Sequence, residues 1–147
     1  MTTVTVMKIN DIQDRIIGDM APMEEWFDKY EYLVEQGKNL GPLDGRFKVE
    51  DNLIKGCQSS VWVHADMVDG RMRFGADSDT LITKGMIALL LKVFDNQYPE
   101  DIAKADLYFI QKTGLSSNLS PSRANGLVSI VERLKQYARE FQANKRR

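Results

Sequence analysis

The chain of 147 residues contains one cysteine, Cys57, and one histidine, His64. One cysteine cannot close a disulfide within the chain, and this pair cannot supply the Cys/His set of a zinc or iron–sulfur site. The longest apolar run, residues 86–91, is far shorter than the roughly 18–20 residues that span a bilayer. The N-terminus also lacks the pattern of a secretory signal. We therefore expect a soluble, cytoplasmic protein with no resident metal or cofactor.

Neither sign of charge dominates, since 20 basic residues stand against 21 acidic ones and the formal net charge is -1. Without a general cationic field, nucleic acid is not an expected partner. The basic residues 145–147 are interpreted as favourable charge at a helix C-terminus and a solubilising tail. Length and an apolar content of 43% predict one globular domain, with its core over about residues 9–142 and a basic tail at 143–147.

Apolar residues at helical spacing predict two helices in the first 40 residues. Asn10 is a good N-cap for a short helix over residues 12–17, and Gly18 is expected to weaken its end. Pro22 suits the first turn of a second, amphipathic helix that Gly37 ends.

The middle of the chain has the pattern of a β-hairpin. Residues 40–50 are turn formers and charges, which predicts a loop that wraps the domain, and residues 52–55 are interpreted as a short strand. Apolar and polar residues then alternate over 61–66, and the pair Asp69-Gly70 is a hairpin turn signal. We place Trp62 in the core rather than on a partner surface.

The second half predicts a central helix and several others around it. Residues 82–94 are the most apolar segment, and residues 77–79 offer N-caps, which is the role we assign to Asp77 and Asp79. Short helices are expected around Ile102 and over residues 107–112, and a last helix opens at Pro121. The predicted fold is α+β: a small antiparallel sheet, made of a hairpin and a third strand, packed against several helices.

Cys57 stands outside every apolar stripe of these helices. Its neighbours Gly56, Gln58 and Ser59 are glycine or polar, and Gly56 leaves space beside the sulfur and permits unusual backbone angles. A lone cysteine is commonly a small buried hydrophobe, and composition alone favours that interpretation. The position outside the stripes favours a reactive thiol instead, so both interpretations stay open on these residues alone.

A reactive Cys57 needs its thiolate, which is a minor species of an unperturbed thiol near neutral pH. A nearby cation raises the thiolate fraction, and Lys55 and Arg123 are the candidates. His64, on a predicted strand, is a candidate general base. A cysteine hydrolase would require a histidine and an acid at a recognised spacing, and no such set is present.

Three sequence motifs provide evidence beyond the immediate neighbours of Cys57. They are Gly56-Cys57-Gln58-Ser59-Ser60-Val61-Trp62, then Gly75-Ala76-Asp77-Ser78-Asp79 leading to Ile82-Thr83-Lys84-Gly85, then Leu119-Ser120-Pro121-Ser122-Arg123-Ala124-Asn125-Gly126-Leu127. Together with Trp26-Phe27-Asp28-Lys29-Tyr30, their order and separation resemble the SufE family, the sulfur-acceptor proteins of iron–sulfur cluster biogenesis. The resemblance covers about residues 9–140 and implies a SufE/IscU-like fold.

The resemblance implies a function and a set of partners. A SufS-like cysteine desulfurase, which carries pyridoxal phosphate, would hold sulfur as a persulfide that Cys57 attacks. The protein would stimulate the desulfurase and relay sulfur to an iron–sulfur scaffold, with no cofactor of its own.

The resemblance also assigns roles around Cys57. Gly56, Gln58 and Ser59 would support it, and Arg123 would lie near it and favour the thiolate or persulfide anion. The alternative for Arg123 is a structural arginine that bonds carbonyls at a helix start. The alternative function is an allosteric activator of a desulfurase in which Cys57 is structural.

Overall fold

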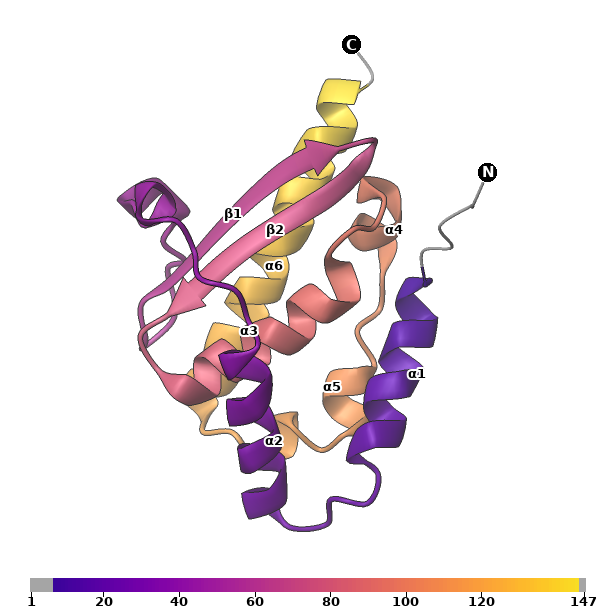
Figure 1. Ribbon diagram of the computed structural model, residues 1–147, viewed down its shortest axis with the longest axis vertical. Helices are drawn as coiled ribbons and strands as arrows, with labels where there is room; N and C mark the ends of the chain where they lie inside the picture. The colour runs from indigo at the N-terminus through magenta and orange to yellow at the C-terminus, as the bar shows by residue number, and fades with distance from the viewer. Residues whose placement is uncertain (1–6, 146–147) are drawn as a thin grey trace.

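The computed structural model describes residues 7–145, with the side chains of 7–144 (Figure 1). A two-stranded hairpin lies against helices, which confirms the predicted α+β class. The elements in chain order are α1 (Ile9–Met20), α2 (Trp26–Lys38), the 3-10 turns η1 (Gly45–Phe47) and η2 (Glu50–Asn52), β1 (Val61–Val68), β2 (Arg71–Ser78), α3 (Leu81–Phe94), α4 (Pro99–Lys104), α5 (Phe109–Lys112), the 3-10 turn η3 (Ser116–Asn118) and α6 (Pro121–Lys145).

The hairpin forms where its turn signal predicts it. Strands β1 and β2 pair antiparallel, and the register ends with Val68 opposite Arg71. Asp69 and Gly70 connect them with φ of 54° and 80°. A tight hairpin turn of this kind needs positive φ at both central residues, which Asp and Gly adopt more readily than other residues.

The predicted third strand at residues 52–55 is wrong. Within the described residues the sheet has two strands, and this segment contributes one isolated bridge, between Leu53 and Trp62. The pairing does not extend because η2 precedes the bridge and the chain turns away at Gly56, whose φ is 94°. Residues 55–60 therefore leave the sheet as a loop, and Cys57 lies in it.

The two faces of the hairpin have different neighbours. Val61 and Val63 are fully buried on the inner face, which packs against α3 and α6. Since side chains alternate along a strand, Trp62 and His64 point to the outer face. There the segment 43–49 covers them, and Phe47 stacks on His64 with ring centroids 3.7 Å apart. The core assignment of Trp62 is therefore wrong, whereas the wrapping loop is confirmed.

Helix α3 is the central helix, as predicted, and eight of its residues are buried. It crosses α2 at two glycines, Gly85 and Gly37. A Cβ atom added to Gly85 would lie 2.1 Å from the carbonyl oxygen of Leu33, and one added to Gly37 would lie 3.0 Å from the backbone N of Gly85. The two helices thus touch through their backbones, which sets the position of α3 under the hairpin.

The first two helices have other boundaries than predicted. Helix α1 begins one residue before Asn10, which is not its N-cap; the Asn10 side chain accepts a hydrogen bond from Nε2 of the buried Gln13 at 3.1 Å. The helix continues past Gly18 because Met20 is buried in the core. Helix α2 begins four residues after Pro22. In α1 the burial of Met20 thus outweighs the local signal of Gly18.

Two helices of the second half agree with their predicted places. Helix α4 begins at Pro99 and contains the buried Ile102, and α6 begins at Pro121. Helix α6 runs 25 residues to Lys145, so residues 143–145 of the predicted tail are helical, and the rest of that tail lies outside the described residues. None of the helices formed by residues 7–145 is long and apolar enough to cross a membrane.

Candidate functional site

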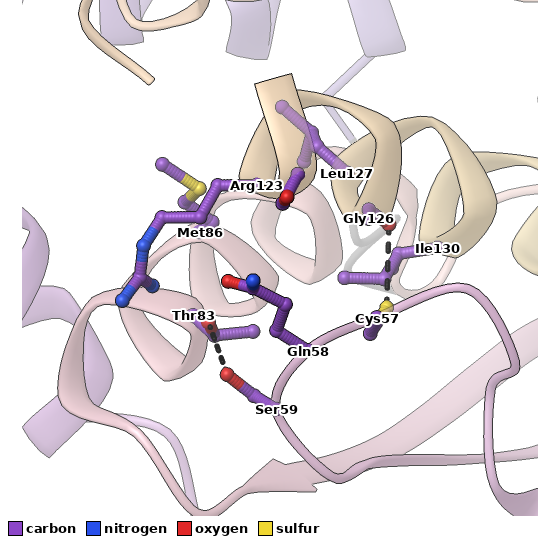
Figure 2. A pocket seen from close by; sticks show the side chains of 10 residues that line it. Cys57, Gln58, Ser59, Thr83, Met86, Arg123, Gly126, Leu127 and Ile130 are labelled. Atoms are coloured by element: carbon purple, nitrogen blue, oxygen red, sulfur yellow. Dashed lines mark hydrogen bonds between the residues drawn. The ribbon is translucent and has the colours of Figure 1, made fainter. Parts of the chain in front are cut away.

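Cys57 lies at a small recess between its loop and the first turns of α3 and α6 (Figure 2). The recess has a free volume of about 20 Å³, which holds about one water molecule. Its lining residues come from three segments that are far apart in the sequence: Cys57, Gln58 and Ser59 from the loop, Thr83 and Met86 from α3, and Ser122, Arg123, Gly126, Leu127 and Ile130 from α6.

The sulfur of Cys57 packs against the backbone of α6. The thiol donates to the carbonyl oxygen of Gly126 over 3.5 Å (Figure 2). A Cβ atom on residue 126 would lie 3.4 Å from Sγ, an ordinary van der Waals distance, so the sulfur lies directly against the helix at Gly126. Cys57 is half-buried, and burial raises its pKa above the ordinary value for a thiol. In this arrangement the neutral thiol is favoured over the thiolate.

Gly56 determines the backbone turn of the loop on the N-terminal side of Cys57. The positive φ of Gly56 lies in the left-handed region, and a Cβ there would approach Oγ of Ser129 on α6 to 2.8 Å. At the base of the loop, the backbone N–H of Ile54 donates to the carbonyl of Val61 at 2.8 Å. The glycine therefore lets the chain reverse beside α6 while its two ends stay paired.

Ser59 and Ser60 tie the other side of the loop to the start of α3. Ser59 Oγ lies 2.9 Å from Thr80 Oγ1 and 3.3 Å from Thr83 Oγ1. The backbone N–H of Ser60 donates to the Asp79 carboxylate at 3.0 Å, and the N–H of Asp79 donates back to the carbonyl of Ser60 at 3.3 Å. The loop is thus bonded to α3 at two adjacent residues.

Asp77 and Asp79 are not the N-caps of α3, contrary to the prediction; Thr80 occupies that position. Asp77 lies in β2, where its carboxylate is 2.7 Å from Nζ of Lys48 and 3.4 Å from Nζ of Lys84. Burial alone would raise the pKa of Asp77, but the hydrogen bonds from Lys48 and the backbone of Ser78, with the two lysine charges, outweigh burial and lower it. Asp77 is therefore an ionised structural group that ties β2 to the covering segment and to α3.

Arg123 lines the recess and is its only charged residue among those described. Its guanidinium, however, turns away from the sulfur, on the far side of Gln58 (Figure 2). The hydrogen bond that Arg123 makes at the start of α6 comes from its backbone N–H, which donates to Ser120 Oγ at 3.3 Å. The position of Arg123 in the Cys57 recess thus agrees with the expectation from the sequence. The pKa of Cys57 is nevertheless raised, because burial and not the Arg123 charge sets its direction.

The other sequence candidates lie elsewhere. Lys55 is exposed and does not line the recess. His64 faces the outer side of the hairpin, where its Nε2 is 2.9 Å from the Asp66 carboxylate. No group of three or more His, Cys, Asp or Glu side chains in the described part of the chain has the arrangement of a metal site.

Several residues that line the recess were given no role from the sequence, although two of them lie within the motifs. Thr83 and Gly126 fall within the second and third motifs, but periodicity assigned them to helices and gave them no role. Met86 and Ile130 have the pattern of ordinary core residues. Their convergence on Cys57 depends on how α3 and α6 pack, which local pattern does not encode.

A family model described as "SufE: Fe-S metabolism associated domain" matches residues 14–138. The chain belongs to the SufE family. This membership connects it to iron–sulfur metabolism and confirms the resemblance seen in the sequence.

Individual SufE relatives support the assignment over most of the chain. An uncharacterised SufE-like protein of Rhizobium meliloti is 38% identical over an alignment of 130 positions, which covers 85% of this chain and 93% of that protein. SufE-like protein 1, chloroplastic/mitochondrial, of Arabidopsis thaliana is 41% identical over 111 residues, 75% of this chain but 30% of the longer plant protein.

A solved structure shows the same fold at lower identity. It is the solution structure of a hypothetical protein from Thermus thermophilus, with a TM-score of 0.73 and 21% identity over 88% of this chain and 94% of that chain. At this identity the likeness concerns the fold alone.

Proposed function

We propose that this SufE protein accepts sulfur as a persulfide on Cys57 from a cysteine desulfurase and passes it on to an iron–sulfur scaffold. The observation that carries the proposal is the free volume of about 20 Å³ beside the only cysteine of the chain. This space suits one additional atom such as a sulfane sulfur.

The chemistry requires one thiol and no cofactor on this chain. The Cys57 thiolate attacks the terminal sulfur of the donor persulfide, and a new sulfur–sulfur bond forms at Cys57. The sulfur–sulfur bond of the donor breaks, and the donor cysteine leaves as a thiolate that takes up the proton lost by Cys57. The sulfane sulfur keeps its oxidation state, so no oxidant or second cysteine is needed.

The raised pKa of Cys57 gives docking a role in this reaction. In the free protein, burial favours the thiol, which is a poor nucleophile. Movement of residues 54–60 toward the desulfurase would expose the sulfur and bring its pKa back toward the ordinary value. Return to the recess would then shield the persulfide from oxidants.

The supporting residues follow from their contacts. Gly56 provides the backbone turn, Ser59 bonds the loop to α3, and Gln58 borders the recess. Arg123 lines the same recess as Cys57. We propose that its side chain turns toward the sulfur on docking, where its charge would stabilise a thiolate or persulfide.

The test is sulfur loading followed by intact mass. The full chain is incubated with a cysteine desulfurase, pyridoxal phosphate and cysteine, and the expected product carries the mass of one extra sulfur atom. Cys57→Ser should gain none. Absence of added sulfur on the wild type, or equal addition on Cys57→Ser, would contradict the proposal.

A second function has an observation in its favour, because Cys57 packs against the core and its pKa is raised, as in a structural cysteine. In that case the protein activates a desulfurase allosterically without accepting sulfur. The same variant decides between the two functions: full stimulation of desulfurase turnover by Cys57→Ser, with no other acceptor present, would favour the activator.

A further inference from the structure

Three hydroxyl groups meet where the Cys57 loop touches α3. Ser59 Oγ is 2.9 Å from Thr80 Oγ1 and 3.3 Å from Thr83 Oγ1, and Figure 2 shows the second of these contacts beside the recess. We propose that Ser59, Thr80 and Thr83 form a hydroxyl latch that holds Cys57 in its recess while the protein is free. In this role they are positioning residues, since none of them exchanges sulfur.

The backbone at Thr80 supports this role independently. Thr80 is the N-cap residue of α3, with extended φ and ψ of -122° and 143°. A threonine at this position ordinarily accepts a hydrogen bond from the backbone N–H two or three residues later. Here the side chain makes no such bond and contacts Ser59 instead. The Thr80 side chain therefore binds the loop and does not cap α3. Departures from local preferences of this kind are expected at functional sites, where function competes with local stability.

The latch matters because, apart from the packing of Cys57 against the core, it provides two of the three described side-chain hydrogen bonds at residues 57 and 59. The Ile54–Val61 bond and the contacts between Ser60 and Asp79 lie at the base of the loop. Within it, the hydrogen bond of the Cys57 thiol is long, at 3.5 Å, and sulfur is a weak donor. The equilibrium between a closed and an open loop is therefore sensitive to the two contacts of Ser59.

This inference rests on the proposed function for its purpose, which is to keep a sulfur-accepting thiol unreactive until a desulfurase docks. Its geometry can be tested without any sulfur donor. The measurement is the rate at which iodoacetamide alkylates Cys57 in the free, full-length protein, followed by intact mass at neutral pH.

Valine replaces threonine with nearly the same shape and no hydroxyl, so Thr80→Val and Thr83→Val remove the latch without opening a cavity. We expect Thr80→Val to accelerate alkylation about fivefold, which corresponds to the roughly 1 kcal/mol of a net hydrogen bond. Thr83→Val, with the longer contact, should have a smaller effect, and the double variant the largest. Ser59→Ala removes the shared partner and should match the double variant, which provides a second route if the double variant folds poorly.

Two controls separate a latch from general loosening of the fold. Thr80→Ser keeps the hydroxyl and should react like the wild type. Thr113→Val removes a buried hydroxyl that donates to the carbonyl of Phe109 at 2.7 Å and does not line the recess. It should lower Tm without accelerating alkylation.

The pH dependence of the alkylation rate distinguishes a latch from a general contribution to stability. Because opening exposes the sulfur, the midpoint of the alkylation-rate profile should fall toward that of an ordinary thiol in the latch variants, but not in Thr113→Val. Wild-type rates and midpoints in both the double variant and Ser59→Ala, or an equal acceleration in Thr113→Val, would overturn the inference.

The outcomes also separate this inference from the proposed function. Faster alkylation together with failed sulfur loading would leave the latch standing and remove the sulfur-acceptor function. Normal sulfur loading with unchanged alkylation would support the sulfur-acceptor function and overturn the latch.

Discussion

The crossing of α2 and α3 predicts that Gly85→Ala is strongly destabilising. The added Cβ would lie 2.1 Å from the Leu33 carbonyl oxygen and 2.6 Å from its carbonyl carbon. The obstacle is backbone, so no side chain can rotate away. An ordinary contact starts at 3.4 Å, which requires the helices to separate by more than 1 Å in a region where most residues of α3 are buried.

The magnitude follows from two opposing effects. Overpacking of a well-packed core costs about 1–3 kcal/mol and occasionally more, and a backbone clash belongs at the upper end. Alanine recovers up to about 1 kcal/mol through its higher helix propensity. We expect a net loss of about 2 kcal/mol in the free energy of unfolding. For a chain of this length, 1 kcal/mol shifts Tm by about 3 °C, so Tm should fall by about 6 °C.

Gly18→Ala is the matched control within the same fold. Gly18 is exposed in α1, and an added Cβ meets nothing within 4 Å. Helix propensity then acts alone, and stability should rise by about 0.5–1 kcal/mol. Thermal and urea unfolding of both variants measure the two values. A Gly85→Ala protein as stable as the wild type would refute the backbone contact between α2 and α3.

Two further predictions concern titrating groups. The rate of Cys57 alkylation in the wild type should rise with pH through a midpoint above that of an unfolded reference peptide, because burial raises the Cys57 pKa; a midpoint at or below the peptide's would contradict this. Asp77→Asn should cost about 1–2 kcal/mol at neutral pH, through weakened contacts to Lys48 and Lys84. Since the folded-state pKa of Asp77 is lowered, its contribution is present above the unfolded pKa and is lost as pH falls through the folded one. Urea unfolding of both proteins should therefore converge below about pH 4, and a constant gap would count against the ion pairs.

The sequence predicted those parts of the fold whose signals are local and strong. Asp69-Gly70 identified the hairpin because few residues tolerate two consecutive positive φ angles. The apolar segment 82–94 predicted the central helix because an element that is apolar nearly all round must be buried. Pro121 marked the start of α6 because its φ suits a first helical turn.

Local signals failed where several weak preferences competed. Residues 77–79 are all good caps, but the N-cap position falls to the next residue, Thr80, whose side chain contacts the Cys57 loop instead of capping the helix. Trp62 looked like core, but alternation along β1 sends it to the face that the wrapping loop covers. In both cases the outcome depends on neighbours that are distant in the sequence.

A single thiol, Cys57, stands outside the apolar stripes and beside a glycine, and this is evident from the amino-acid order alone, as is the family through its motifs. The sequence left open whether that thiol is inert or reactive, because burial and approach are properties of packed elements. Only the tertiary structure brought Gly126 from α6 and Thr80 and Thr83 from α3 to the same loop. These contacts join residues some 20 to 70 positions apart, and a periodic pattern read along the chain carries no information about them.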